Sequence, residues 1–318
     1  MRILVVGAGA TGGFYGGRLA LAGQDVTFLV RPARAAALRE RGLRIVGPGL
    51  RGPEEELRPG LVLPGGIDAP YDVVLLSVKA GALDRSLDDL APAVGPGTVI
   101  IPFLNGMAHL DAITRRFGAD AALGGVVRVF GTLDDNGDVR ILDRISESVL
   151  ADMVIGEPSG GSGGSSARVE RIGKELSHAG FDVAVSPDIL GVMWGKWVFI
   201  STLGALTTLM RGSVGDVVTA GGAWLGPALL AEAAAVASAA GHAVPEAHLS
   251  RIASGLTRPD STDTASLYRD TAAGLPTEGE HILGDLTARA RELGVATPLL
   301  DLAALQLRVH ELRLQQRQ

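Results

Sequence analysis

The pattern of apolar residues in the first thirty positions predicts a strand, a helix and a second strand. Arg2–Val6 is a short apolar run rich in β-branched residues, which is typical of a strand buried in a parallel sheet. The segment Thr11–Ala22 has the spacing of a helix and runs into Gly23, and Asp25–Val30 is a second strand-like run. We therefore expect a β–α–β unit at the start of the chain.

Apolar runs and helical periods alternate up to about residue 186. The runs that predict further strands are Leu43–Val46, Leu61–Leu63, Tyr71–Val78, Gly97–Leu104, Val154–Gly156 and Phe181–Val185. The helical periods between them are Ala33–Arg41, Leu83–Leu90, Leu110–Phe117 and Val169–His178. Val126–Leu142 reads as two extended runs joined at Asp135-Asn136-Gly137, which predicts a hairpin. We expect Val154–Gly156 and Phe181–Val185 to extend the sheet of this hairpin.

The chain has a different pattern after Ser186-Pro187, because no alternating strand is evident there. Long Ala- and Leu-rich helical periods follow instead: Asp188–Thr207, Gly226–Ala240, His248–Ser254, Thr264–Ala273, Glu278–Leu293 and Pro298–Leu314. The stretch Glu157–Ser166 has the composition of a flexible linker. We interpret it as a surface loop and expect the domain boundary between residues 186 and 187.

Composition places the chain among globular enzymes. Its 318 residues suffice for two domains, and 47% hydrophobic with 20% charged residues is ordinary for a soluble enzyme. The formal net charge of −6 and the lack of a basic block argue against nucleic acid and anionic membrane surfaces as partners. Gly226, Pro227 and Glu232 interrupt the apolar stretch Ala220–Ala240, so a buried helix is expected there rather than a membrane span.

The absence of cysteine excludes disulfides and thiolate metal sites, and we expect no metal. The first predicted strand begins at residue 2 with no signal peptide before it. A cytoplasmic location is therefore expected.

Three glycines follow the first predicted strand with the spacing G-x-G-x-x-G. Gly7 permits a tight turn, Gly9 lets the backbone approach a pyrophosphate, and Gly12 lets the helix pack closely on the strand. The helix N-terminus adds unpaired N–H groups and a positive dipole end. The alternative is a glycine-rich turn that binds nothing. The residues expected to cradle a dinucleotide are Gly7, Ala8, Gly9, Ala10, Thr11 and Gly12.

The residue after the second strand indicates which dinucleotide is bound. NAD-binding units usually place Asp or Glu there to hold the ribose 2′-hydroxyl. This chain has Arg31, with Arg34 close behind and no carboxylate before Glu40. A guanidinium suits a 2′-phosphate, although a solvated surface arginine is the alternative. We therefore predict an α/β fold with a Rossmann-type NADP-binding domain (residues 1–186) and an all-helical C-terminal domain (residues 187–318).

Two more polar residues follow predicted strands, at the sheet edge where ligands of open α/β sheets bind. Lys79 could face the cofactor phosphates, or it is a surface lysine. Asn105, followed by Gly106, could bond the nicotinamide ribose or a substrate, or the pair forms only a turn.

The helical domain supplies two candidates for acid–base chemistry. Lys196 lies in Val192–Ile200, the most aromatic and apolar setting in the chain. Such a lysine is either snorkelling to the surface or partly buried with a lowered pKa. Glu278 starts a predicted helix after Pro276-Thr277, a position that acids also occupy for helix-dipole reasons alone.

Several short motifs, taken together, make the chain resemble the ketopantoate reductase (2-dehydropantoate 2-reductase) family over nearly its full length. They are GAGATG with Arg31, VKA at Val78–Ala80, NGM at Asn105–Met107, W-x-K at Trp194–Lys196, and Ser266 ahead of PTE at Pro276–Glu278. Their order and spacing fit the family, and jointly they are more specific than any one of them.

The resemblance implies an enzyme that uses NADPH to reduce a 2-oxo acid, 2-dehydropantoate, in pantothenate biosynthesis. By position, Lys196 resembles the catalytic lysine and Glu278 the acid at the substrate hydroxyl. Asn105 resembles the asparagine that faces cofactor and substrate, and Ser266 the substrate-binding serine. Helical second domains of such enzymes often pair subunits, so a homodimer is expected.

Two residues of the expected substrate site depart from the family pattern. Ile200 stands four residues after Lys196, and Asp263 stands three residues before Ser266, where the family usually or commonly has asparagine. Isoleucine makes the pocket more apolar, and a carboxylate repels that of an oxo acid. The substrate could therefore be a bulkier oxo acid or one carrying an amine. A 3-hydroxy-acid or opine dehydrogenase and a non-catalytic NADP sensor are further alternatives.

Overall fold

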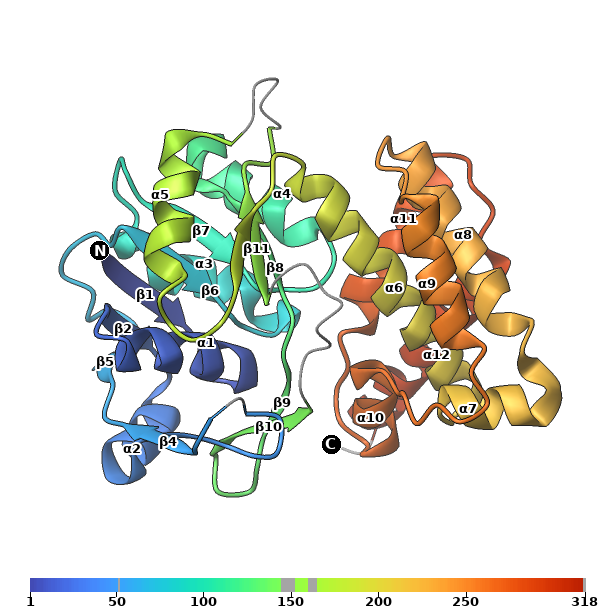
Figure 1. Ribbon diagram of the computed structural model, residues 1–318, viewed down its shortest axis with the longest axis horizontal. Coiled ribbons are helices and arrows are strands. Elements are labelled where there is room, and N and C mark those ends of the chain that lie inside the picture. Colours follow the sequence, from blue (N-terminus) through green and yellow to red (C-terminus); the bar gives the residue numbers. More distant parts are fainter. Residues whose placement is uncertain (51, 144–151, 160–164, 317–318) are drawn as a thin grey trace. The chain divides into compact units, whose positions relative to one another are not determined.

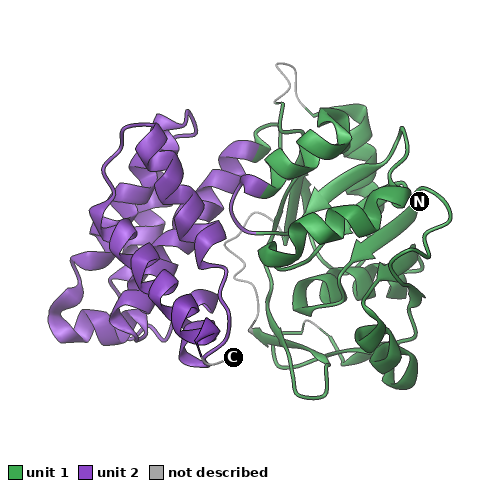
Figure 2. Cartoon of the chain, turned by 180° about the vertical axis from the view of Figure 1, so that it is seen from behind, with its two compact units in different colours: residues 1–104, 109–189 green, residues 105–108, 190–318 purple. Residues whose placement is uncertain are grey.

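The computed structural model describes residues 1–50, 52–143, 152–159 and 165–316. It divides into two compact units (Figure 2): an N-terminal unit of residues 1–104 and 109–189, and a helical unit of residues 105–108 and 190–318. The sequence predicts a boundary after residue 186, and the chain enters the helical unit between Ile189 and Leu190. Half of the predicted surface loop Glu157–Ser166 is described, and residues 160–164 lie outside the described residues.

A parallel five-stranded sheet forms the centre of the N-terminal unit (Figure 1), in the order β5-β2-β1-β6-β7. Its strands are β1 (Arg2–Val6), β2 (Asp25–Leu29), β5 (Gly60–Val62), β6 (Val73–Leu76) and β7 (Val99–Pro102). The helices that connect or cover them are α1 (Ala10–Leu21), α2 (Pro32–Arg41), α3 (Leu83–Leu90), α4 (Ala108–Phe117) and α5 (Ala167–Leu176). The N-terminal β–α–β unit and the parallel sheet are therefore as predicted.

Both faces of this sheet are buried because successive side chains of a strand point to opposite sides. In β1, Ile3 and Val5 join one core cluster with Phe14 of α1, whereas Leu4 joins a second cluster with Leu87 of α3. A continuous apolar run, rather than an alternating one, is what a strand covered on both faces requires.

Two smaller sheets complete the N-terminal unit. One has the order β4-β3-β10-β9, with β3 (Leu43–Val46), β4 (Glu55–Leu57), β9 (Phe130–Leu133) and β10 (Val139–Asp143). The other has the order β12-β11-β8, with β8 (Gly124–Val127), β11 (Met153–Gly156) and β12 (Val183–Val185). The predicted hairpin is confirmed, because β9 and β10 pair in antiparallel fashion around the turn.

The expectation that Val154–Gly156 and Phe181–Val185 extend the hairpin sheet is wrong. Strand β11 pairs with β8 and β12 in a sheet of its own. On the sequence pattern, the run that begins at Val126 is expected to form the first strand of the hairpin. It is divided between two strands instead: Val126 and Val127 end β8, and the hairpin strand β9 begins at Phe130 in another sheet.

The helical unit consists of α6 (Ile189–Met210), α7 (Val214–Val217), α8 (Leu225–Ala239), α9 (Glu246–Leu256), α10 (Ser266–Ala272), α11 (Asp285–Glu292) and α12 (Pro298–Gln315). A π-helical turn, Glu280–Gly284, leads into α11. Helix α6 is long and apolar enough to cross a membrane by length and composition, and so is the bent pair Val214–Gly222 and Leu225–Ala239. Most of the apolar part of α6 is buried, as in the core helix of a helical domain.

Candidate active site

The glycine loop between β1 and α1 is shaped by close backbone contacts at two of its glycines. Gly7 has φ +95°, and a Cβ there would lie 2.4 Å from the carbonyl oxygen of Ser77. A Cβ on Gly12 would lie 2.1 Å from the carbonyl oxygen of Gly7. A Cβ on Gly9 would meet nothing within 4 Å. Space at Gly9 is therefore left open by the protein itself, which fits a diphosphate approaching the backbone there.

The start of α1 also suits an anion. Gly9 is the N-cap of α1, and no side chain caps the helix. Ala10 and Thr11 form its first turn, so the N–H groups at this end remain for a ligand such as a phosphate. The shape of the loop and the uncapped helix end are compatible with the dinucleotide cradle that the motif predicts.

The two arginines after β2 have different surroundings. Arg31 precedes α2 and its side chain is exposed. Arg34 is half-buried: its Nε donates to the carbonyl of Ala8 at 3.1 Å and its Nη1 to the carbonyl of Gly137 at 2.9 Å. Burial lowers the pKa of Arg34. Only Arg31 therefore has the exposure expected of a residue that meets a cofactor phosphate from solvent.

Lys79 lies on the same side of the unit as the glycine loop. Ser77 extends the ladder of β6 by donating its N–H to the carbonyl of Val6, and its own carbonyl is the group that a Cβ on Gly7 would meet. Lys79 follows two residues later, exposed, and starts the short helical turn Ala80–Ala82. Lys79 thus follows the carboxyl end of β6, and its role at the cofactor phosphates stays a prediction.

Asn105 belongs to the helical unit although it follows β7. Gly106 has φ +82°, and a Cβ there would lie 2.7 Å from the carbonyl oxygen of His281 and 3.9 Å from Cε2 of Trp197. Trp197 in turn donates its indole N–H to the carbonyl of Ile282 at 2.9 Å. The loop that carries Asn105 is therefore packed between α6 and the turn that leads into α11.

These contacts bring together the segments that carry Asn105, Lys196 and Glu278. Lys196 is half-buried and adjoins Trp197 on α6. Glu278 is half-buried too, and its carbonyl accepts from Ile282 N at 3.0 Å. The amide, the ammonium and the carboxylate thus come from three neighbouring backbone segments of one unit.

Two contacts with α12 hold the Glu278 segment in place. The backbone N–H and hydroxyl of Thr277 donate to Oε1 of Glu311 at 2.7 and 2.9 Å, and Arg308 pairs with Glu280. Sequence reasoning missed these residues, because Glu311 is 34 positions from Thr277 and no local pattern connects them.

The α6 face around Lys196 is apolar. Its other partly exposed residues are Val192, Phe199, Ile200 and Leu203. Ser201 and Thr202 lie on the buried side, where the Thr202 hydroxyl donates to Val198 O at 2.8 Å. The partly exposed face of α6 therefore carries one cationic residue, Lys196, among hydrocarbon side chains.

Asp263 lies before α10, and Ser266 lies at its start. Ser266 is exposed and is the first residue of that helix. Its neighbour Leu267 packs on Gly204 of α6, where a Cβ would lie 2.9 Å from Leu267 Cδ1. The exposed Asp263 accepts from the Ser261 hydroxyl at 2.8 Å. Ser266 therefore lies beside α6, about two helical turns after Lys196. The described hydrogen bond of the Asp263 carboxylate joins it only to Ser261, two residues away.

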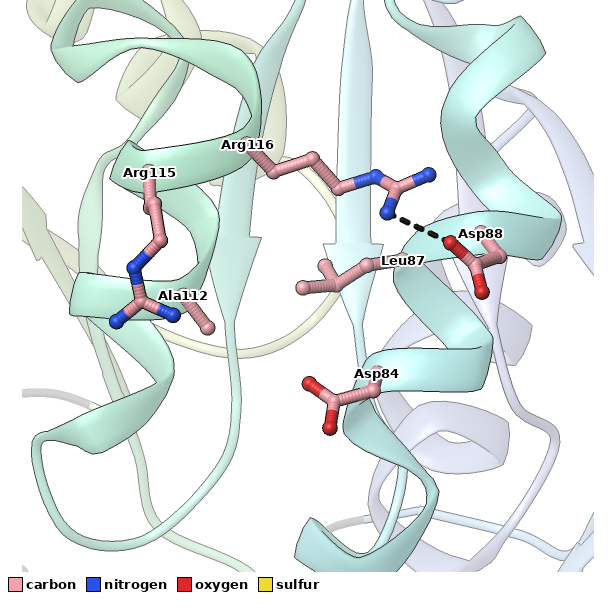
Figure 3. Close-up of a pocket in the computed structure, with 6 residues that line it drawn as sticks. All are labelled: Asp84, Leu87, Asp88, Ala112, Arg115 and Arg116. Atoms are coloured by element: carbon pink, nitrogen blue, oxygen red, sulfur yellow. Dashed lines mark ion pairs between the residues drawn. The ribbon is translucent and has the colours of Figure 1, made fainter.

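A pocket of about 370 Å³ lies elsewhere, between α3 and α4 (Figure 3). Its lining residues are Asp84, Leu87, Asp88, Ala112, Arg115 and Arg116. Arg116 pairs with Asp88 across it at 2.6 Å, and it contains none of the predicted site residues. We assign it no role in the reaction.

Comparisons with known proteins find relatives over nearly the whole chain. A family model described as "Ketopantoate reductase PanE/ApbA" matches residues 3–154, and its C-terminal counterpart matches residues 188–311. The chain is 31% identical to the uncharacterized oxidoreductase YkpB of Bacillus subtilis, covering 98% of this chain and 99% of that one. It is 28% identical to 2-dehydropantoate 2-reductase of Mesorhizobium japonicum, over 95% of each. The crystal structure of 2-dehydropantoate 2-reductase from Geobacter metallireducens superposes with a TM-score of 0.85 at 26% identity, covering 97% of this chain and 99% of that chain.

Proposed function

The chain belongs to the ketopantoate reductase family and is an NADP-dependent oxidoreductase, and we propose that it reduces 2-dehydropantoate to pantoate. The observation that carries this proposal is the packing of the Asn105 loop between α6 and the turn after Glu278. This packing makes the segments that carry Asn105, Lys196 and Glu278 neighbours in the helical unit, which supports the proposal. A role in pantothenate biosynthesis follows from that substrate, and the cytoplasmic location expected from the sequence stays a prediction.

We assign binding of the cofactor phosphates to the N-terminal unit and substrate binding to the helical unit. The diphosphate lies against Gly7–Gly12, where Gly9 leaves open space. Arg31 meets the 2′-phosphate and Lys79 the neighbouring phosphates, since both are exposed cations after strands of the parallel sheet. Asn105 bonds the nicotinamide ribose or the substrate. When bound, NADPH supplies a hydride to the C2 carbonyl carbon of the substrate.

The helical unit supplies the proton and the orientation. As negative charge develops on the C2 oxygen, the Lys196 ammonium polarises that oxygen and protonates it. Glu278 accepts a hydrogen bond from the new hydroxyl and orients the lysine. Ser266 binds the substrate from α10. The apolar surroundings of Lys196 exclude water and strengthen these electrostatic contacts.

The first experiment measures NADPH oxidation by the purified protein with 2-dehydropantoate. Turnover of this compound is expected. Turnover of another 2-oxo acid alone would retain the chemistry and change the substrate. NADPH binding with no turnover of any oxo acid would contradict the proposal and favour the sensor.

A different oxo acid is the second candidate, and the observation that favours it is Ile200. The side chain lies one turn after Lys196 on a face that has no other polar group from α6. A substrate hydroxyl buried against it loses its hydrogen bond to water without a replacement, at a cost of about 1–3 kcal/mol. An oxo acid with an apolar branched chain avoids this cost.

The Ile200→Asn variant is expected to shift specificity toward the hydroxylated substrate. The matched pair is 2-dehydropantoate and 3,3-dimethyl-2-oxobutanoate, which lacks only its hydroxyl group. We expect the ratio of the two kcat/KM values to rise about 10-fold in favour of 2-dehydropantoate, the value of one hydrogen bond. Val192→Asn, on the same face but one turn before Lys196, serves as the control. An unchanged ratio in Ile200→Asn would remove this residue from the substrate site.

We also propose that the protein is a homodimer formed through α12. Leu302, Leu305, Val309 and Leu312 form an apolar stripe on this helix, and they are 55%, 54%, 39% and 56% exposed. The opposite face of α12 is apolar and buried, so the helix is apolar on both sides and still needs a partner.

The stripe suits a second copy of the same helix. The residues of the stripe are spaced by three, four and three positions, which is the same spacing in both chain directions. A two-fold axis between Leu305 and Val309 therefore pairs the stripe of one copy with the same stripe of an antiparallel second copy. Neighbouring charges are already neutralised within the chain, because Arg308 pairs with Glu280 and Arg291 with Asp301. Two copies can therefore approach without like-charge repulsion.

Leu305→Glu is expected to convert the dimer to a monomer, since it buries a carboxylate in an apolar helix pair. Light scattering after size exclusion gives the mass directly. Leu293→Glu, at a 42% exposed leucine outside the stripe, should remain dimeric. A monomeric wild-type protein would refute the dimer.

A further inference from the structure

We propose that Arg34 is a positioning residue of the cofactor site, which fixes the Ala8–Gly9 peptide so that the glycine loop is ready for the diphosphate. It then acts through the loop and does not bind the 2′-phosphate. This inference rests on the proposed place of the diphosphate at Gly7–Gly12. It assigns different tasks to the two arginines, Arg31 and Arg34, that follow β2.

The evidence begins with the two backbone carbonyls that Arg34 holds. Its Nε donates to Ala8 O at 3.1 Å and its Nη1 to Gly137 O at 2.9 Å. Ala8 stands between the first two glycines of the loop, and Gly137 lies in the turn of the β9–β10 hairpin. One planar guanidinium thus joins the cofactor loop to a separate sheet.

The peptide that Arg34 holds also carries the N–H of Gly9. A peptide bond is planar and trans, so the N–H of Gly9 points opposite to the carbonyl of Ala8. Holding that carbonyl on one side aims the N–H toward the other side. Gly7 and Gly9 have wide conformational freedom, and a fixed peptide between them removes much of it before the cofactor binds.

The hairpin turn is a firm support because it is held independently of Arg34. Asp138, 5% exposed, pairs with Arg44 at 3.1 Å and with Arg41 at 3.4 Å. Arg41 also donates to Asn136 O at 3.1 Å. Arg34 therefore transmits the position of an anchored turn to the glycine loop.

The charge of Arg34 stays close to the loop. Burial lowers its pKa and the nearby Asp138 opposes that shift, but a guanidinium remains protonated in proteins. Its Nη2 is buried and has no hydrogen-bond partner among the described residues. A cation kept at the back of the loop polarises the Ala8–Gly9 peptide and favours an anion in front of it.

The test compares dissociation constants for NADPH and NADH, measured by calorimetry without substrate. In Arg34→Ala both constants should rise about 10-fold, the value of one charged hydrogen bond, and their ratio should not change. Arg34→Lys keeps the positive charge and a donor that can reach one of the two carbonyls. It should therefore recover part of the lost affinity for both dinucleotides. Hydrogen exchange of the Gly9–Gly13 amides should be faster in Arg34→Ala even without cofactor.

Arg41→Ala is the matched control, because it removes another arginine of α2 while Arg44 still holds Asp138 and Arg34 still holds the carbonyl of Ala8. It should change neither constant by more than about twofold. An equal loss in Arg41→Ala, a loss confined to NADPH in Arg34→Ala, or unchanged binding and exchange in Arg34→Ala would each overturn the proposal. Failure of the wild-type protein to bind either dinucleotide would instead refute the proposed cofactor site, and the exchange measurement would still test the loop.

Discussion

Lys196→Ala is expected to lower kcat by about 10²–10⁴-fold, the usual contribution of a positioned general acid. The Kd for NADPH should stay within about twofold, because the glycine loop and Arg31 belong to the other unit. Lys196 is half-buried on an apolar stretch of α6, so we do not expect bulk water to take over the role of its ammonium. Stopped-flow measurement of the first turnover, together with a cofactor titration, separates the two effects.

Lys174→Ala is the control for this experiment. Lys174 is an exposed lysine on α5 in the N-terminal unit, and its removal deletes the same charge. It should leave kcat unchanged. If Lys196→Ala keeps most of the activity, the reaction is carried by other residues of the helical unit, as in a dehydrogenase for 3-hydroxy acids or opines.

The parts of the fold that depend on local sequence could be predicted. Continuous apolar runs such as Arg2–Val6 identify doubly covered strands, and Asp135-Asn136-Gly137 identifies a turn, because these signals lie within a few residues of one another. The pairing of β11 with β8 and β12 was not predictable in this way. Strand partners depend on contacts between distant segments, which periodicity does not contain.

The same distinction between local signals and distant contacts applies to the candidate site. Gly7, Gly9 and Gly12 are recognisable because their motif is local, and the structure gives Gly7 and Gly12 a steric reason and leaves open space at Gly9. The membership of Asn105 in the helical unit is not recognisable, because it depends on the contact of Gly106 with His281, 175 positions away. The NG pair marks a turn, but nothing near it indicates which surface the turn meets. Arg34 shows the same limit, since its bonds to Ala8 and Gly137 join three segments.

Arg31→Asp is expected to reverse the cofactor preference. An exposed arginine after β2 can form a bidentate contact with the 2′-phosphate, worth about 1.5–3 kcal/mol. Aspartate at this position repels that phosphate and can accept hydrogen bonds from the ribose hydroxyls of NADH. The ratio of kcat/KM for NADPH to that for NADH should therefore fall about 100-fold or more, the sum of a lost attraction and a new repulsion.

Arg39→Asp provides the same change of charge near the other end of α2, the helix that Arg31 precedes. Arg39 is exposed in the last turn of α2, away from the end of β2, so a long-range effect of net charge would appear in this variant as well. Its cofactor ratio should stay within about twofold of the wild type at physiological salt, where charges beyond about 8 Å are screened. An equal loss of NADPH preference in both variants would show that α2 acts through its overall charge. A loss in Arg31→Asp alone places the 2′-phosphate at Arg31, and it separates this contact from the positioning by Arg34, which should affect both dinucleotides alike.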